Sequence, residues 1–117
     1  MKQISKNGWL YIINEQAKEN RNSIKNECKN ILHGTVGKYL FFSHSKEELI
    51  KICETILKEY NLSHGKVPFE NTTKEYVLCI YDVKNRFSKE LSNFSTDTIK
   101  YRFWKSDNAT MRGVYSK

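Results

Sequence analysis

The feature that most constrains this fold is an apolar run from Glu75 to Asp82. Between the two carboxylates, every residue from Tyr76 to Tyr81 is aliphatic, aromatic or a cysteine. Neither set of alternating side chains is polar, so the run predicts a strand covered on both faces. Such a strand belongs in the interior of a sheet, and a helix has to be available to pack against that sheet.

That helix is predicted directly after Ser45. The residues Ser45-Lys46-Glu47-Glu48 match a capping box, in which the serine accepts from a first-turn amide and Glu48 reaches back. Apolar residues then recur with helical spacing until the helix ends near Asn61, at Leu49, Ile52, Cys53, Ile56, Leu57 and Tyr60.

The remaining elements are predicted from shorter patterns. We expect helices over 14–32 and 85–93, strands over 38–43 and 65–69, and a strand from Ile99 that returns after Gly113. Trp9 opens an apolar patch and is expected at a core or edge position rather than as a stacking platform. Together these elements predict a single domain over 1–117 of the α+β class, with a mainly antiparallel sheet and helices packed on one face.

The overall charge narrows the set of partners. A net charge of +7 and a pI near 9.3 favour nucleic acids, nucleotides or an acidic protein as binding partners. A lysine- and asparagine-rich composition alone would also produce this charge and pI. No apolar stretch is long enough for a membrane span or a secretory signal, so we expect a cytoplasmic protein. Cys28, Cys53 and Cys79 lack the spacing of a zinc site and are expected as buried free thiols, with no metal and no cofactor.

The basic segment from Ile99 to Tyr115 is the best candidate for chemistry. Strict alternation would place Ile99, Tyr101 and Phe103 on one side of a strand and Lys100, Arg102 and Trp104 on the other. The candidate ligand-binding residues of this segment are cationic, aromatic or hydroxyl-bearing, with one carboxylate: Arg102, Trp104, Asp107, Thr110, Arg112 and Tyr115. Asp107 and Thr110 could instead only hold the turn, and the aromatic residues could be ordinary sheet residues.

Three residues are candidates for catalysis. Lys66 and Lys105, together with Arg102, could form a phosphate-binding cluster. His64 precedes Lys66 by two residues, so on a strand both side chains share a face. One of the two could remove a proton while the other protonates a leaving oxygen, which would cleave a phosphoester without metal. Solvated lysines and an exposed loop histidine are the alternative interpretation.

From Gly37 onward the chain resembles the phosphothreonine lyase domain family, also called the basophilic leukaemia expressed protein family. The resemblance lies in Gly37 to Phe42 before an acid-capped helix, in Gly65-Lys66-Val67, and in the closing residues Tyr101, Lys105, Asp107, Thr110, Gly113 and Tyr115. Tyr39 stands where that family has tryptophan. The resemblance implies a curved antiparallel sheet backed by helices, similar to the cap-binding translation initiation factor. It also implies that His64 and Lys66 would be the acid and base of a lyase.

The sequence therefore predicts a small basic domain that binds a nucleotide or a linear or cyclic oligonucleotide, and that could cleave it without metal. A phage protein acting against a host signalling or CRISPR system would suit this size and charge. The alternatives are a non-enzymatic inhibitor of a host defence protein, similar to an anti-CRISPR protein, and a plain RNA-binding module. The oligomeric state stays open, and a homodimer is one option.

Overall fold

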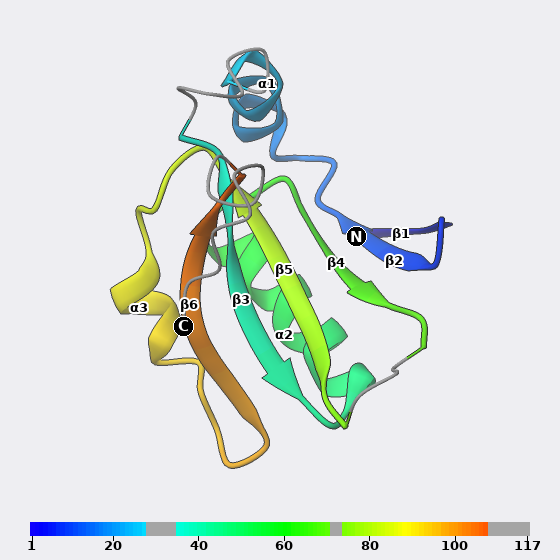
Figure 1. Cartoon of the computed structure of the whole chain (residues 1–117). Coiled ribbons are helices and arrows are strands. Elements are labelled where there is room, and N and C mark those ends of the chain that lie inside the picture. Colours follow the sequence, from blue (N-terminus) through cyan, green and yellow to red (C-terminus); the bar gives the residue numbers. More distant parts are fainter. Residues whose placement is uncertain (28–34, 71–73, 108–117) are drawn as a thin grey trace.

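The computed structural model describes residues 1–27, 35–70 and 74–107. Six antiparallel strands form one open sheet with the order β1-β2-β4-β5-β3-β6, as Figure 1 shows. The strands are β1 (Lys2–Lys6), β2 (Trp9–Ile13), β3 (Gly37–Ser43), β4 (His64–Pro68), β5 (Tyr76–Asp82) and β6 (Ile99–Ser106). The helices are α1 (Lys18–Glu27), α2 (Lys46–Glu59) and α3 (Ser88–Ser92). The predicted α+β class with a curved, mainly antiparallel sheet is confirmed.

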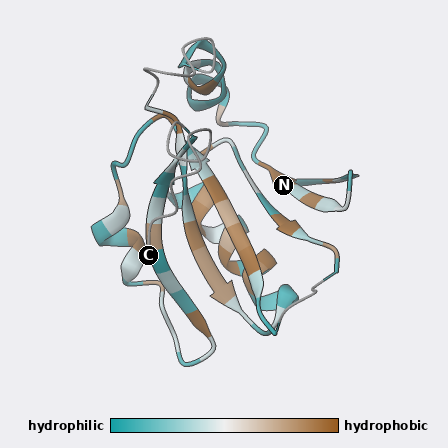
Figure 2. Ribbon diagram, in the orientation of Figure 1, coloured by the Kyte–Doolittle hydropathy of each residue, from teal (hydrophilic) through white to brown (hydrophobic). Residues whose placement is uncertain are grey.

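One face of the sheet packs against α2, which lies behind the strands in Figure 1. The core between them is fully buried and apolar, and Figure 2 shows β3 and β5 as its most hydrophobic strands. The sheet supplies Ile12, Tyr39, Phe41, Val67, Leu78 and Ile80, and the helix supplies Leu49, Cys53, Ile56 and Leu57. We call the opposite side of the sheet the open face. The interior position predicted for Tyr76 to Tyr81 is confirmed, because β5 pairs with both β4 and β3.

Ser45 begins α2 as predicted, but only half of the capping box forms. Its hydroxyl oxygen accepts from the Glu48 amide at 3.3 Å. The Ser45 amide donates to the Ser43 hydroxyl instead, and the Glu48 carboxylate accepts from Thr98. The reciprocal bond is replaced because Thr98 brings a competing donor from the start of β6.

The N-terminal hairpin of β1 and β2 was not predicted. Its turn contains Asn7 and Gly8, both with positive φ, at 53° and 82°. Asn-Gly with positive φ at both central residues is the preferred two-residue hairpin turn. Strand β1 is exposed along its whole length and has no apolar alternation, so only the turn could have revealed it.

Strand β6 departs from the alternation expected from the sequence. A bulge opposite Leu40 and Phe41 leaves Arg102 as an extra residue, so Phe103 pairs with Leu40 and Trp104 pairs with Tyr39. One extra residue reverses the faces beyond it. The prediction that Trp104 shares a side with Lys100 is therefore wrong. Tyr101, which precedes the bulge, faces the core beside Phe41.

A buried carboxylate at the end of β5 joins several elements. Asp82 is fully buried and accepts from the Tyr39 hydroxyl, the Asn20 side chain, the Val83 amide and the Arg86 guanidinium. The Tyr39 oxygen in turn accepts from the amides of Arg86 and Phe87 at 3.0 and 3.1 Å. This network holds α1, β3, β5 and the approach to α3 together.

Some predicted features can be compared only in part. Within the segment expected as a helix over 14–32, the structure describes α1 at 18–27, and the returning strand after Gly113 lies outside the described residues. Cys53 and Cys79 are buried free thiols, as expected, and Cys28 is not among the described residues. No helix in the described ranges combines the length and apolarity that crossing a membrane requires.

The Tyr39 hydroxyl provides the first test of the structure. Tyr39→Phe removes the donor to Asp82 and leaves the part-buried amides of Arg86 and Phe87 without their acceptor, which should lower the free energy of unfolding by about 1–3 kcal/mol. Urea denaturation followed by circular dichroism measures the change. Tyr11→Phe, on β2, is the matched control and should change stability by less than about 0.5 kcal/mol. Equal effects of the two substitutions would contradict the role assigned to this network.

Candidate ligand-binding face

Strand pairing gathers basic and aromatic side chains on the open face. Lys66 pairs with Cys79, and Lys38 pairs with both Tyr81 and Lys105, so these side chains share one side of the sheet. We call Lys38, His64, Lys66, Tyr81 and Lys105 the basic cluster. The two predicted catalytic residues on β4 thus lie on the same face as the predicted lysine of β6.

Aromatic rings hold Lys66 in place. Its ammonium lies 4.2 Å from the centroid of the Trp9 ring and 5.8 Å from that of Tyr81. Within the described ranges, no carboxylate forms an ion pair with Lys66. Trp9 therefore belongs to the open face beside a cation. The aromatic contacts orient the ammonium while leaving its charge uncompensated by a carboxylate there.

His64 is packed flat against Tyr81. The two ring centroids are 4.8 Å apart with an interplanar angle of 16°, and His64 Nδ1 hydrogen-bonds the Ser63 hydroxyl at 3.1 Å. Burial, followed by the charge of Lys66, lowers the pKa of His64 to about 4, against a smaller opposing effect of Asp107. The imidazole is therefore neutral at pH 7 and adds no positive charge to the basic cluster.

Lys38 and Lys105 complete the cluster from β3 and β6. Lys38 Nζ lies 3.5 Å from an Asp107 carboxylate oxygen and 5.7 Å from the centroid of the Tyr81 ring. Burial raises the pKa of the Cys79 thiol, and the charges of Lys38, Lys66 and Lys105 oppose that rise. Three ammonium groups therefore act on one buried point beneath the face.

Gly37 allows β6 to approach this closely. A Cβ at Gly37 would lie 2.5 Å from the Lys105 carbonyl oxygen and 2.6 Å from the Trp104 ring. Any larger residue would push β6 away from β3 and carry Lys105 with it.

Arg102 and Trp104 do not join the basic cluster. The Arg102 guanidinium lies over the Phe42 ring, 4.5 Å from its centroid, and donates to Glu75 at 3.1 Å. Trp104 packs on the helix-covered face, with its ring centroid 4.8 Å from that of Tyr39. The bulge explains both positions, because it places Arg102 and Phe103 on the open face and turns Trp104 inward.

The remaining predicted ligand-binding residues, Thr110, Arg112 and Tyr115, lie outside the described residues. Asp107 is at the cluster, where it pairs with Lys38. Sequence reasoning missed Lys38 and Tyr81, although alternation within the two central strands places both opposite the core. Within the described part of the chain, no three His, Cys, Asp or Glu side chains are grouped to hold a metal ion.

The lowered pKa of His64 predicts how stability depends on pH. Between the ordinary value of 6.5 and about 4, the unfolded chain binds a proton that the folded chain excludes. Stability contributed by His64 is thus fully present above pH 6.5 and is lost as the pH falls toward 4. The loss is at most about 3 kcal/mol. Urea denaturation at several pH values should show a steeper slope in this window for the wild type than for His64→Gln, and identical slopes would contradict the assignment.

Comparison of the chain with protein-family models, curated proteins and solved structures found no match. The resemblance to the phosphothreonine lyase domain family therefore stays a prediction, and the function has to be argued from the open face itself.

Proposed function

We propose that the open face binds the phosphate groups of a nucleotide or a single-stranded oligonucleotide. The observation that carries this proposal is the placement of Lys38, Lys66 and Lys105 on one side of the sheet, with Lys38 and Lys66 beside the Tyr81 ring that stacks on His64. Asp107 pairs with Lys38, but three like charges on one face still give that face a positive potential, which attracts an anion. Exposed lysines in helices avoid mutual repulsion by spreading into solvent. Here strand register places all three lysines on one face, and aromatic rings also contact Lys38 and Lys66.

The aromatic rings beside the cations favour a nucleotide over inorganic phosphate. Trp9 and Tyr81 flank the Lys66 ammonium, so a phosphate at Lys66 places the attached base or sugar against an aromatic surface. Base stacking on aromatic side chains stabilises single-stranded nucleic acids by about 1–3 kcal/mol per base. Cations and aromatic rings on one sheet face form a common arrangement for binding single strands.

The proposal concerns binding rather than cleavage. A general base is most effective when its pKa lies near the working pH. With a pKa of about 4, His64 is a weak base at neutral pH, and its Nδ1 is engaged by Ser63. His64 fits better as a neutral stacking residue that supports Tyr81. The expected metal-free cleavage would need a ligand-induced rise in this pKa.

The binding proposal predicts the effect of removing single charges. Lys66→Gln and Lys105→Gln should each weaken binding of a fluorescently labelled octanucleotide by roughly 10-fold or more at low salt, since a charge-assisted bond contributes about 1.5–3 kcal/mol. Lys51→Gln, on an exposed position of α2, changes the net charge equally and is the matched control. Fluorescence anisotropy at two salt concentrations measures all three variants.

A similar loss of affinity in Lys51→Gln would show that binding depends on overall charge and not on the basic cluster. Absence of binding to the octanucleotide and to nucleoside monophosphates would contradict the proposal and favour a protein partner for this face. Mass spectrometry of the same mixtures in EDTA tests the separate expectation of cleavage, which predicts shortened products that His64→Gln fails to form.

A further inference from the structure

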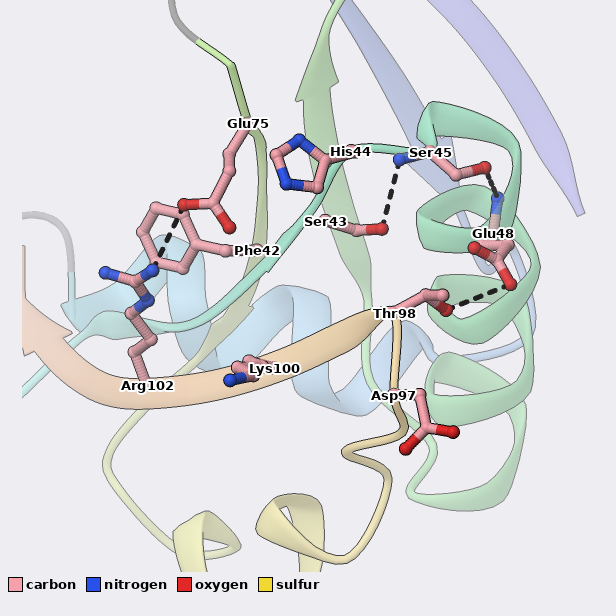
Figure 3. A pocket seen from close by; sticks show the side chains of 10 residues that line it. All are labelled: Phe42, Ser43, His44, Ser45, Glu48, Glu75, Asp97, Thr98, Lys100 and Arg102. Carbon is pink, nitrogen blue, oxygen red and sulfur yellow. Dashed lines mark hydrogen bonds and ion pairs between the residues drawn. The ribbon is translucent and has the colours of Figure 1, made fainter.

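A hollow lies along the sheet from the basic cluster, where β3 ends and β6 begins (Figure 3). It has a volume of about 440 Å³, and its lining includes Phe42, Glu48, Glu75, Thr98, Lys100 and Arg102. Phe42, Lys100 and Arg102 come from the open face and Glu48 comes from α2, so the hollow runs from the surface that carries the cluster around the end of the sheet.

The floor of the hollow suits a flat ring. The Phe42 ring is partly exposed, and the Arg102 guanidinium lies over it with 4.5 Å to the ring centroid. Glu75 fixes that guanidinium through a 3.1 Å bond, and Figure 3 shows Glu75 and Arg102 together at the Phe42 ring. An aromatic ring and a guanidinium plane are both surfaces on which nucleobases stack.

Charge differs between the two ends of the surface. The hollow contains the carboxylates of Glu48, Glu75 and Asp97 beside Lys100 and Arg102. At the basic cluster, Asp107 pairs with Lys38. A phosphate is repelled by the carboxylates and attracted by the cluster, which gives a bound ligand one orientation.

The carboxylates also discriminate between bases. An ionised carboxylate only accepts hydrogen bonds, and two carboxylates line the hollow: Glu75 accepts there from Arg102, and Glu48 accepts from Thr98. Adenine, cytosine and guanine present an exocyclic amino group, whereas uracil presents carbonyl oxygens on either side of a single N–H. The hollow is therefore matched to bases that carry an amino group.

We propose that this hollow is a nucleobase subsite for amino-bearing bases, occupied by a nucleotide whose neighbouring phosphate lies at the basic cluster. The inference rests on the proposed function. Lys38 and Phe42 are four residues apart on β3, about 13 Å at the usual strand rise, so a dinucleotide suits the span better than a single nucleotide.

The test uses the full chain and three probes, which are the 5′-phosphorylated dinucleotides pCpC and pUpU and inorganic tripolyphosphate. Isothermal titration calorimetry should show pCpC binding at least about 5-fold more tightly than pUpU. Phe42→Leu should weaken pCpC roughly 5- to 150-fold and leave tripolyphosphate unchanged, because only the base stacks. Phe69→Leu, at an exposed aromatic residue outside the hollow, is the matched control and should change neither.

Glu75→Gln separates base selection from stacking, because the glutamine side-chain amide can also donate a hydrogen bond to a carbonyl oxygen of uracil. It should reduce the preference for pCpC over pUpU. If tripolyphosphate and both dinucleotides bind equally and Phe42→Leu changes nothing, the subsite is refuted while the phosphate site stands. If no probe binds, the proposed function itself is refuted, and circular dichroism spectra show whether each variant is folded.

Discussion

The fold depends on a single buried negative charge. Asp82 is fully shielded from solvent at the end of the central strand, where an uncompensated carboxylate would cost several kcal/mol. Donors from Asn20, Tyr39, Val83 and Arg86 compensate it, and Asn20, the most distant of them in sequence, lies 62 residues from Asp82. Because one carboxylate accepts from all of these donors, it fixes the positions of α1, β3 and the approach to α3 relative to each other. The Tyr39 and Arg86 contacts also explain why this end of the sheet is ordered around polar groups instead of apolar ones.

Sequence reasoning was most accurate where burial produces a repeating pattern. The run from Tyr76 to Tyr81 and the helix after Ser45 were predicted to within a residue or two, since each buries a continuous apolar surface. The polar strand at Lys2–Lys6 has no such surface, and only the Asn7-Gly8 turn marked it. The sequence marks Asp82 only as the end of a strand, because the residues next to it do not show that Asn20 and Tyr39 hydrogen-bond it.

The bulge at Arg102 shows the limit of reasoning by alternation. In β6 the sequence reads as a regular strand, and the extra residue arises only from how β6 fits against β3. This one irregularity moves Trp104 from the expected ligand side into the core, where it packs on Tyr39. It also places Arg102 over Phe42 instead of beside Lys66. The bulge also brings Lys105 onto the open face opposite Lys38, whereas strict alternation would place it on the side of Tyr101.

The open face is unusual in how its cations are held. A surface lysine ordinarily gains little from a carboxylate and loses side-chain entropy when it is fixed. Here Lys66 lies between Trp9 and Tyr81, which restrict its side chain without cancelling its charge. His64, on β4, stacks on Tyr81 and supports its ring. Because the imidazole is neutral, His64 adds no positive charge to that of the lysines. The ordering of Lys66 that a bound phosphate would otherwise have to impose is already present in the fold, and this preorganisation supports the phosphate binding proposed for the face.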